Sequence, residues 1–162
     1  MRGICFKEPL FRAVVSGRKT VTRRMNDLYE VDDILFLKEP YRLEADNVIK
    51  YKFSSQQLDK EKWRNKLFMR ADYARYHIKI TGKRRERLQE ITDEDCIREG
   101  IYVGKVGSEK THFMTAYYSP HDHQPCISAK RAFSCLIDEI NGPGTWDSNP
   151  IVTRYEFILV DF

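Results

Sequence analysis

The stretch GRKTVTRR at residues 17–24 decides the local fold, because it begins where the first helix must end. Residues 8–16 before it carry apolar side chains at helical spacing: Leu10, Phe11, Val14 and Val15. Gly17 suits the position just after a helix, since glycine readily adopts positive φ. The β-favouring Thr-Val-Thr that follows predicts an extended segment. The sequence therefore predicts a helix, a turn and a strand, with four basic side chains at the junction.

Other segments predict a mixture of strands and helices that do not alternate regularly. Strands are expected at residues 3–6, 34–38, 49–53, 76–88 with a break at Gly82, and 151–160. Helices are expected at residues 93–99, with Thr92 as N-cap, and at 129–140. Residues 54–73 are interpreted as an irregular insertion with one short helix, and residues 102–128 as a long loop. This order favours an α+β domain built on a mixed, barrel-like sheet over a doubly wound parallel sheet.

The size and composition favour one domain with a core of its own. The chain has 162 residues, of which 41% are hydrophobic and 32% charged, a balance that disfavours disorder. No apolar run approaches the roughly 20 residues of a membrane-spanning helix. The four cysteines lie far apart in sequence and form no C-x-x-C pair. We therefore expect a single cytoplasmic domain over residues 1–162, with no membrane association.

Basic side chains are concentrated in two runs, although the formal net charge is only +4. One run is residues 18–24. The other is residues 79–87, where five basic residues accompany Glu86 alone. Either run is as typical of a solvated surface as of a phosphate-binding one, and Arg84 and Arg85 are the candidate phosphate contacts of the second.

Four motifs in a fixed order resemble the ASCH domain family, and most closely its larger, phage-associated members. They lie at residues 17–24, 32–35, 86–101 and 146–150. The resemblance covers roughly residues 4–40, 75–101 and 129–162, and it leaves insertions at about 41–74 and 102–128. It implies a PUA-like mixed β-barrel with flanking helices.

The resemblance also implies two classes of function. PUA-like domains commonly bind RNA, and some small ASCH proteins are amidohydrolases that remove the acetyl group of N4-acetylcytidine with a lysine, a threonine and a glutamate. The matching positions are Lys19, Thr22 and Glu99. RNA, a nucleoside or a nucleotide is therefore the expected partner, with no cofactor. The expected binding residues are Gly17, Arg18, Arg23, Arg24, Arg84 and Arg85.

The chemistry of these residue types agrees with an acyl transfer. A threonine hydroxyl is a weak nucleophile that needs a neighbouring base. Lysine serves as that base when burial and nearby positive charge lower its pKa, and Arg18, Arg23 and Arg24 would supply the charge. A glutamate across the site would relay a proton or hold the base, and Arg24 would contact an oxyanion or a phosphate.

Several alternatives remain open at this stage. Lys19 and Arg24 would also suit phosphate contacts without catalysis, with Glu99 paired to Arg98 or Lys105. The chain is longer than the small hydrolases and has Arg23 where they usually have an apolar residue. A phage protein that acts through a host protein partner is a further possibility. We expect no metal site, because the residues around His121 match no zinc spacing.

Overall fold

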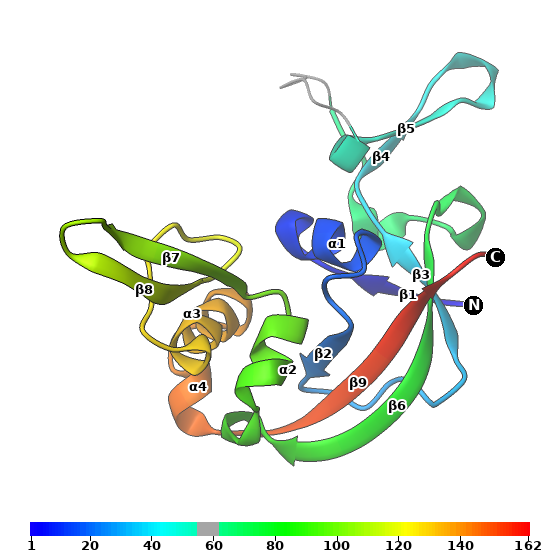
Figure 1. Ribbon diagram of the computed structural model, residues 1–162. Coiled ribbons are helices and arrows are strands. Elements are labelled where there is room, and N and C mark those ends of the chain that lie inside the picture. The colour runs from blue at the N-terminus through cyan, green and yellow to red at the C-terminus, as the bar shows by residue number, and fades with distance from the viewer. Residues whose placement is uncertain (55–61) are drawn as a thin grey trace.

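A five-stranded mixed sheet forms the centre of the computed structural model, which describes residues 1–54 and 62–162 (Figure 1). The first strand pairs in parallel with its neighbour, and every other pairing in this sheet is antiparallel. The mixed α+β prediction is thereby confirmed. The order across the sheet is β1 (Arg2–Cys5), β3 (Ile34–Lys38), β6 (His77–Arg87), β9 (Ile151–Val160) and β2 (Val21–Arg24).

The two long strands β6 and β9 give the sheet its curvature. They pair along almost their whole length, and the register shifts between Ile80 and Gly82. Such an irregularity bends a strand and increases its twist, and Figure 1 shows both strands as strongly curved ribbons. The predicted break at Gly82 is therefore confirmed as a bulge within one continuous strand.

Four α-helices surround this sheet in the described ranges. Their starts follow the local sequence: the hydroxyls of Thr92 and Ser128 accept hydrogen bonds from the amides of Asp95 and Arg131. The helices are α1 (Glu8–Val15), α2 (Asp93–Arg98), α3 (Ala129–Asn141) and α4 (Thr145–Ser148). Single turns of 3₁₀ helix are η1 (Ala45–Asn47), η2 (Lys52–Ser54), η3 (Lys66–Phe68), η4 (Ala71–Tyr73) and η5 (Leu88–Glu90).

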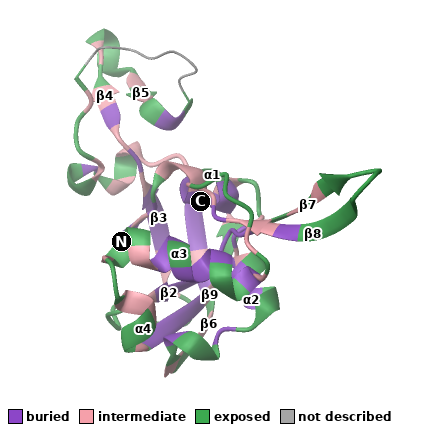
Figure 2. Ribbon diagram, turned by 90° about the vertical axis from the view of Figure 1, so that its left-hand side faces the viewer, coloured by how far each residue is buried: buried purple, intermediate pink, exposed green. Residues whose placement is uncertain are grey.

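The hydrophobic core lies between the sheet and the helices α1 and α3. Figure 2 shows the buried residues running along β3, β9 and the sheet-facing side of α3. The predicted α3 stripe is buried at Phe133, Leu136 and Ile137, whereas Ile140 at its end is 38% exposed. Trp146 on α4 packs edge to face on Phe133, with ring centroids 6.1 Å apart. The apolar stripe of α3 is therefore longer than the part that the core buries, and its last residue, Ile140, lies outside the core.

The two insertions contain regular structure of their own. The expected long loop at 102–128 is wrong, because β7 (Tyr102–Ser108) and β8 (His112–Tyr118) form an antiparallel hairpin that projects from the body of the molecule (Figure 1). Most of its side chains are exposed on both faces, so no alternation marks the strands. Gly107 lies at φ +120° against the His112 carbonyl, where a side chain would collide. Gly104 and Gly107 therefore belong to strand β7 and do not indicate a loop.

The other insertion, 41–74, is a small two-stranded unit with short helical turns. β4 (Tyr41–Leu43) pairs with β5 (Ile49–Tyr51), which confirms part of the strand expected at 49–53. Two 3₁₀ turns, η3 and η4, replace the single short helix expected later in this insertion. Residues 55–61 of the insertion lie outside the described residues.

The sheet does not close into a barrel within the described part of the chain. Its edge strands are β1 and β2, and no strand pairing joins them there. A side chain joins them instead: Arg24 Nη2 on β2 donates to the Cys5 carbonyl oxygen on β1 at 2.8 Å. The two edges therefore lie near each other without sharing a ladder, and the gap between them positions the site described below.

None of the helices in residues 1–54 and 62–162 has the length and apolar character required to cross a membrane.

Gly17 provides a test of how α1 ends. It adopts φ +75° immediately after the helix, and a Cβ added there would meet open space. We expect Gly17→Ala to lower the free energy of unfolding by about 1–2 kcal/mol, because only the left-handed backbone opposes the new side chain. Gly17→Asn should cost less, since asparagine tolerates this conformation better. Chemical denaturation measures both, and equal stabilities of all three proteins would contradict this account.

Candidate functional site

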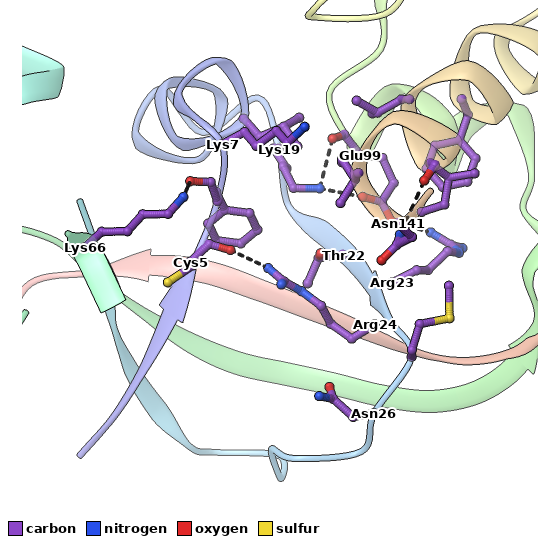
Figure 3. A pocket seen from close by; sticks show the side chains of 17 residues that line it. Cys5, Lys7, Lys19, Thr22, Arg23, Arg24, Asn26, Lys66, Glu99 and Asn141 are labelled. Atoms are coloured by element: carbon purple, nitrogen blue, oxygen red, sulfur yellow. Dashed lines mark hydrogen bonds and ion pairs between the residues drawn. The ribbon is translucent and has the colours of Figure 1, made fainter. Parts of the chain in front are cut away.

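A cavity of about 290 Å³ lies between the end of β1, strand β2 and helix α3 (Figure 3). One wall comes from β1 and the start of α1, with Cys5, Phe6, Lys7 and Leu10. A second comes from β2 and the residues on either side of it, with Lys19, Thr22, Arg23, Arg24, Met25 and Asn26. The third is α3, with Phe133, Leu136, Ile137, Ile140 and Asn141, and the lining is completed by Lys66 and Glu99. The cavity is thus apolar on one side and basic on the other.

Thr22 presents a hydroxyl with no hydrogen-bond partner among the described residues. It lies in the middle of β2, is 4% exposed and lines the cavity. Figure 3 shows it between the pair formed by Lys19 and Glu99 and the side chain of Arg24. A buried hydroxyl normally finds a partner, so this one is available to a ligand or to a catalytic base.

Lys19 is buried and is held by three acceptors. Its Nζ donates to Glu99 Oε2 at 2.5 Å, to the Val21 carbonyl at 2.8 Å and to the Glu99 carbonyl at 2.9 Å. Burial lowers the pKa of Lys19, the Glu99 carboxylate opposes this shift, and the guanidinium groups of Arg24 and Arg23 add to it. Two of the three predicted cationic neighbours thus act as expected.

Glu99 sits at the end of α2, where Gly100 at φ +118° terminates the helix. Its Oε2 receives the Lys19 bond, and its Oε1 receives a bond from Arg23 Nη1 at 3.2 Å. The alternative pairing with Arg98 or Lys105 is therefore wrong. The structure brings Lys19, Thr22 and Glu99 to one cavity, although Glu99 is 77 residues beyond Thr22 in the sequence.

Behind Glu99 lies a second buried carboxylate, Asp95, which holds two arginines in place. Arg23 Nη2 and Arg154 Nε donate to its Oδ2 at 2.5 Å and 2.6 Å. Burial alone would raise the pKa of Asp95, but the bonds from Arg154 and Arg23 together hold it well below its ordinary value. Arg23 also binds Glu86 at 2.8 Å. Arg23 is thereby fixed by three carboxylates, which orients the Glu99 side chain toward the cavity.

Arg24 has donor capacity that the protein leaves unused. One nitrogen, Nη2, bonds to the Cys5 carbonyl, and the guanidinium lies 5.1 Å from the centre of the Phe6 ring. The Nε atom is buried and has no hydrogen-bond partner among the described residues. Burial lowers the pKa of this arginine. The predicted contact of Arg24 with an oxyanion or phosphate therefore has a free donor to make it.

The remaining predicted binding residues do not line this cavity. Gly17 ends α1, and Arg18 donates to the Gly100 carbonyl at 2.9 Å while its guanidinium stacks over the Tyr102 ring. Arg84 is paired with Glu86 at 2.9 Å, and Arg85 is exposed on β6. Lys79 and Lys83 of the same run are paired with acidic residues at 2.6–2.7 Å. The second basic run is therefore largely neutralised by its own surroundings.

Several lining residues could not be assigned to a site from the sequence. In the sequence, Phe6 and the apolar stripe of α3 look like ordinary core residues. The one feature that points to a site is the length of the stripe, whose last residue, Ile140, is not buried by the core. Lys66 lies in an insertion to which the family resemblance assigns no function. Its Nζ reaches the Phe6 carbonyl oxygen at 2.7 Å, so the insertion does contribute to the cavity.

The described residues contain no group of histidine, cysteine, aspartate and glutamate side chains suited to hold a metal ion. His121, the start of the histidine-rich segment, lies 3.7 Å from the Glu139 carboxylate.

Comparisons with known protein families, with curated proteins and with solved structures find no match to this chain. Membership of the ASCH family therefore remains a prediction that rests on the motifs.

Asp95 gives the buried ion network a testable pH dependence. Its pKa is lower in the folded protein than the ordinary 3.8, so its contribution to stability is complete above that value and is lost as the pH falls through the folded pKa. We expect Asp95→Asn to destabilise the protein at pH 7 by about 3 kcal/mol or more, because two buried arginines lose their carboxylate. The variant should also lose less further stability between pH 5 and pH 2 than the unmodified protein does.

Denaturant titrations across this pH range measure both effects. Asp93→Asn, at an exposed position in the same helical turn, is the matched control and should change stability little. Identical pH profiles for the unmodified protein and Asp95→Asn would contradict the assignment.

Proposed function

We propose that this chain is an ASCH-type protein with a PUA-like fold that binds a nucleoside in the cavity and hydrolyses an amide on its base, as in N4-acetylcytidine. The observation that carries the proposal is the meeting of Lys19, Thr22 and Glu99 at one cavity, with the Thr22 hydroxyl unbonded among the described residues. A threonine and a buried lysine of lowered pKa that line the same cavity supply the nucleophile and the base of an acyl transfer.

The walls of the cavity support a flat, partly apolar ligand. The Phe6 ring stands on one side, and the α3 side chains Phe133, Leu136 and Ile137 stand on the other. Aromatic and aliphatic surfaces of this kind stack on bases, whose faces are apolar while their edges are polar. A volume of about 290 Å³ is at the small end for ligand pockets and suits one nucleoside.

The proposed reaction needs two proton transfers through Lys19. Burial lowers the pKa of Lys19, and loss of its proton to solvent yields a neutral amine that stays next to the Glu99 carboxylate. This amine takes the Thr22 proton as Oγ1 attacks the acyl carbonyl, and it then returns the proton to N4 as the cytidine amine leaves. Water hydrolyses the resulting Thr22 ester, which releases the carboxylic acid and restores the hydroxyl. Arg23 acts as a positioning residue that holds Glu99.

Binding of an RNA strand across the surface is the competing function, and the charges favour it less. The candidate contacts Arg84 and Arg85 lie outside the cavity, and most of the basic residues near them are already paired with carboxylates. A protein that acts through a host protein partner would leave the cavity without a role.

Release of cytidine from N4-acetylcytidine, measured by chromatography, tests the proposal. We expect Thr22→Val, which keeps the side-chain shape and removes the hydroxyl, to lower kcat/KM at least a hundredfold. Thr22→Ser should retain part of the activity. Thr115→Val is the control, because Thr115 also lies on a strand but is exposed on the hairpin and does not line the cavity. Full turnover by Thr22→Val would refute the nucleophile. Binding of cytidine with no turnover by the unmodified protein would leave a binding site without the proposed chemistry.

The pH dependence of the same reaction tests Lys19 as the base. The neutral amine is the active form and burial lowers its pKa, so kcat/KM should rise with pH and level off below the ordinary lysine value of 10.5. A steady-state pH series measures this. A rate that falls as the pH rises from 6 to 9 would exclude a lysine base.

A further inference from the structure

Beyond Thr22, toward the end of β1, the cavity has a second group of polar side chains. Arg24 approaches from β2, and Lys66 approaches from η3 in the insertion (Figure 3). Lys66 Nζ donates a hydrogen bond to the Phe6 carbonyl oxygen, and Arg24 Nη2 donates one to the Cys5 carbonyl oxygen. The two cations are therefore held by consecutive residues at the end of β1. Lys7 lines the same region, and its ammonium is 3.8 Å from the Glu139 carboxylate at an exposed position.

The charges of this region are unbalanced. Glu99 is the one acidic residue that lines the cavity in the described chain, and both of its oxygens are taken by Lys19 and Arg23. Neither Arg24 nor Lys66 has an ion-pair partner among the described residues. Burial lowers the pKa of Lys66, and the positive charges of Arg24 and Lys7 lower it further. Cations held together without a counter-charge attract an anion.

The buried Nε of Arg24 makes a ligand the natural counter-charge. An arginine nitrogen that is shielded from water and lacks an acceptor costs free energy, which an anionic oxygen of a ligand would recover. A guanidinium and an ammonium that line one end of the same cavity suit a phosphate group, which carries close to two negative charges and several acceptor oxygens. A carboxylate would balance only one of the two cations.

We propose that Arg24 and Lys66 form a phosphate subsite, so that the substrate is an acylated nucleotide and not the free nucleoside. This inference rests on the proposed function for the identity of the base. It assigns the insertion at 41–74 a role, because Lys66 is the residue through which that insertion reaches the site. It also assigns Arg24 to phosphate binding, leaving the acyl group to Thr22 and its neighbours.

The test compares binding of cytidine with binding of cytidine 5′- and 3′-monophosphate by calorimetry, since these products undergo no turnover. We expect one of the monophosphates to bind at least tenfold more tightly than cytidine, as a charge-assisted contact predicts. Lys66→Gln should lower that ratio several-fold, because one of the two cations of the subsite is lost while Arg24 remains. Lys62→Gln, an exposed lysine of the same insertion outside the cavity, should retain the full ratio.

Other outcomes overturn the subsite. Equal affinities of the unmodified protein for cytidine and both monophosphates would overturn it. An equal loss of affinity for all three ligands in Lys66→Gln would also overturn it, because such a loss would indicate a structural role of Lys66. Inorganic phosphate should weaken binding of the preferred monophosphate without displacing cytidine, and no effect of phosphate would count against the proposal.

The chemistry and the subsite can fail separately. Monophosphate preference with no hydrolysis of N4-acetylcytidine or its monophosphates would refute the amidohydrolase and retain the phosphate site. Hydrolysis at equal efficiency with and without the phosphate would refute the subsite and retain the amidohydrolase.

Discussion

The Glu99 carboxylate, buried between the ammonium of Lys19 and the guanidinium of Arg23, is the interaction on which the rest of the site depends. A single buried charge is costly, so each of these groups requires the others and neither cation can relax toward solvent. Asp95 extends the same network to Arg154 on β9. These ion pairs therefore join the end of α2 to the residues at the start of β2 and to the interior strand β9. The strand pairing of the sheet does not include α2.

The buried ion network holds Lys19 and Glu99, two groups of the proposed chemistry, inside a stable fold. Replacing a buried ion network with apolar residues is often neutral or stabilising, so its presence is not explained by stability alone. Here it holds a lysine of lowered pKa in the cavity that Thr22 also lines, where the threonine hydroxyl has no hydrogen-bond partner in the described chain. Buried ionisable groups of this kind reduce the stability of a fold, but their shifted pKa values suit them to acid–base chemistry. The α3 wall completes the arrangement, because its apolar side chains line the same cavity as the charged residues.

Within the described residues, only one of the two insertions contributes to the site. The segment that carries Lys66 reaches the cavity, whereas the β7–β8 hairpin projects away from the sheet (Figure 1). Contacts near the start of that hairpin, such as Arg18 on the Gly100 carbonyl and the Tyr102 ring, fasten it to the end of α2 without bringing it to Thr22. One of these segments thus contributes a side chain to the cavity, and the other forms a separate exposed surface.

The sequence by itself determined the elements whose signals are local. The helix ended by Gly17, the Thr92 cap, the bulge at Gly82 and the apolar stripe of α3 follow from backbone preferences and periodicity within a few residues, and motif order identified Lys19, Thr22 and Glu99 as candidates. Only the tertiary structure decided which of these meet. It joined Glu99 to Lys19, separated Arg84 and Arg85 from the cavity, opened the expected barrel between β1 and β2, and brought in Lys66. The reason is that contacts between residues tens of positions apart depend on sheet curvature and strand order, and no short pattern records them.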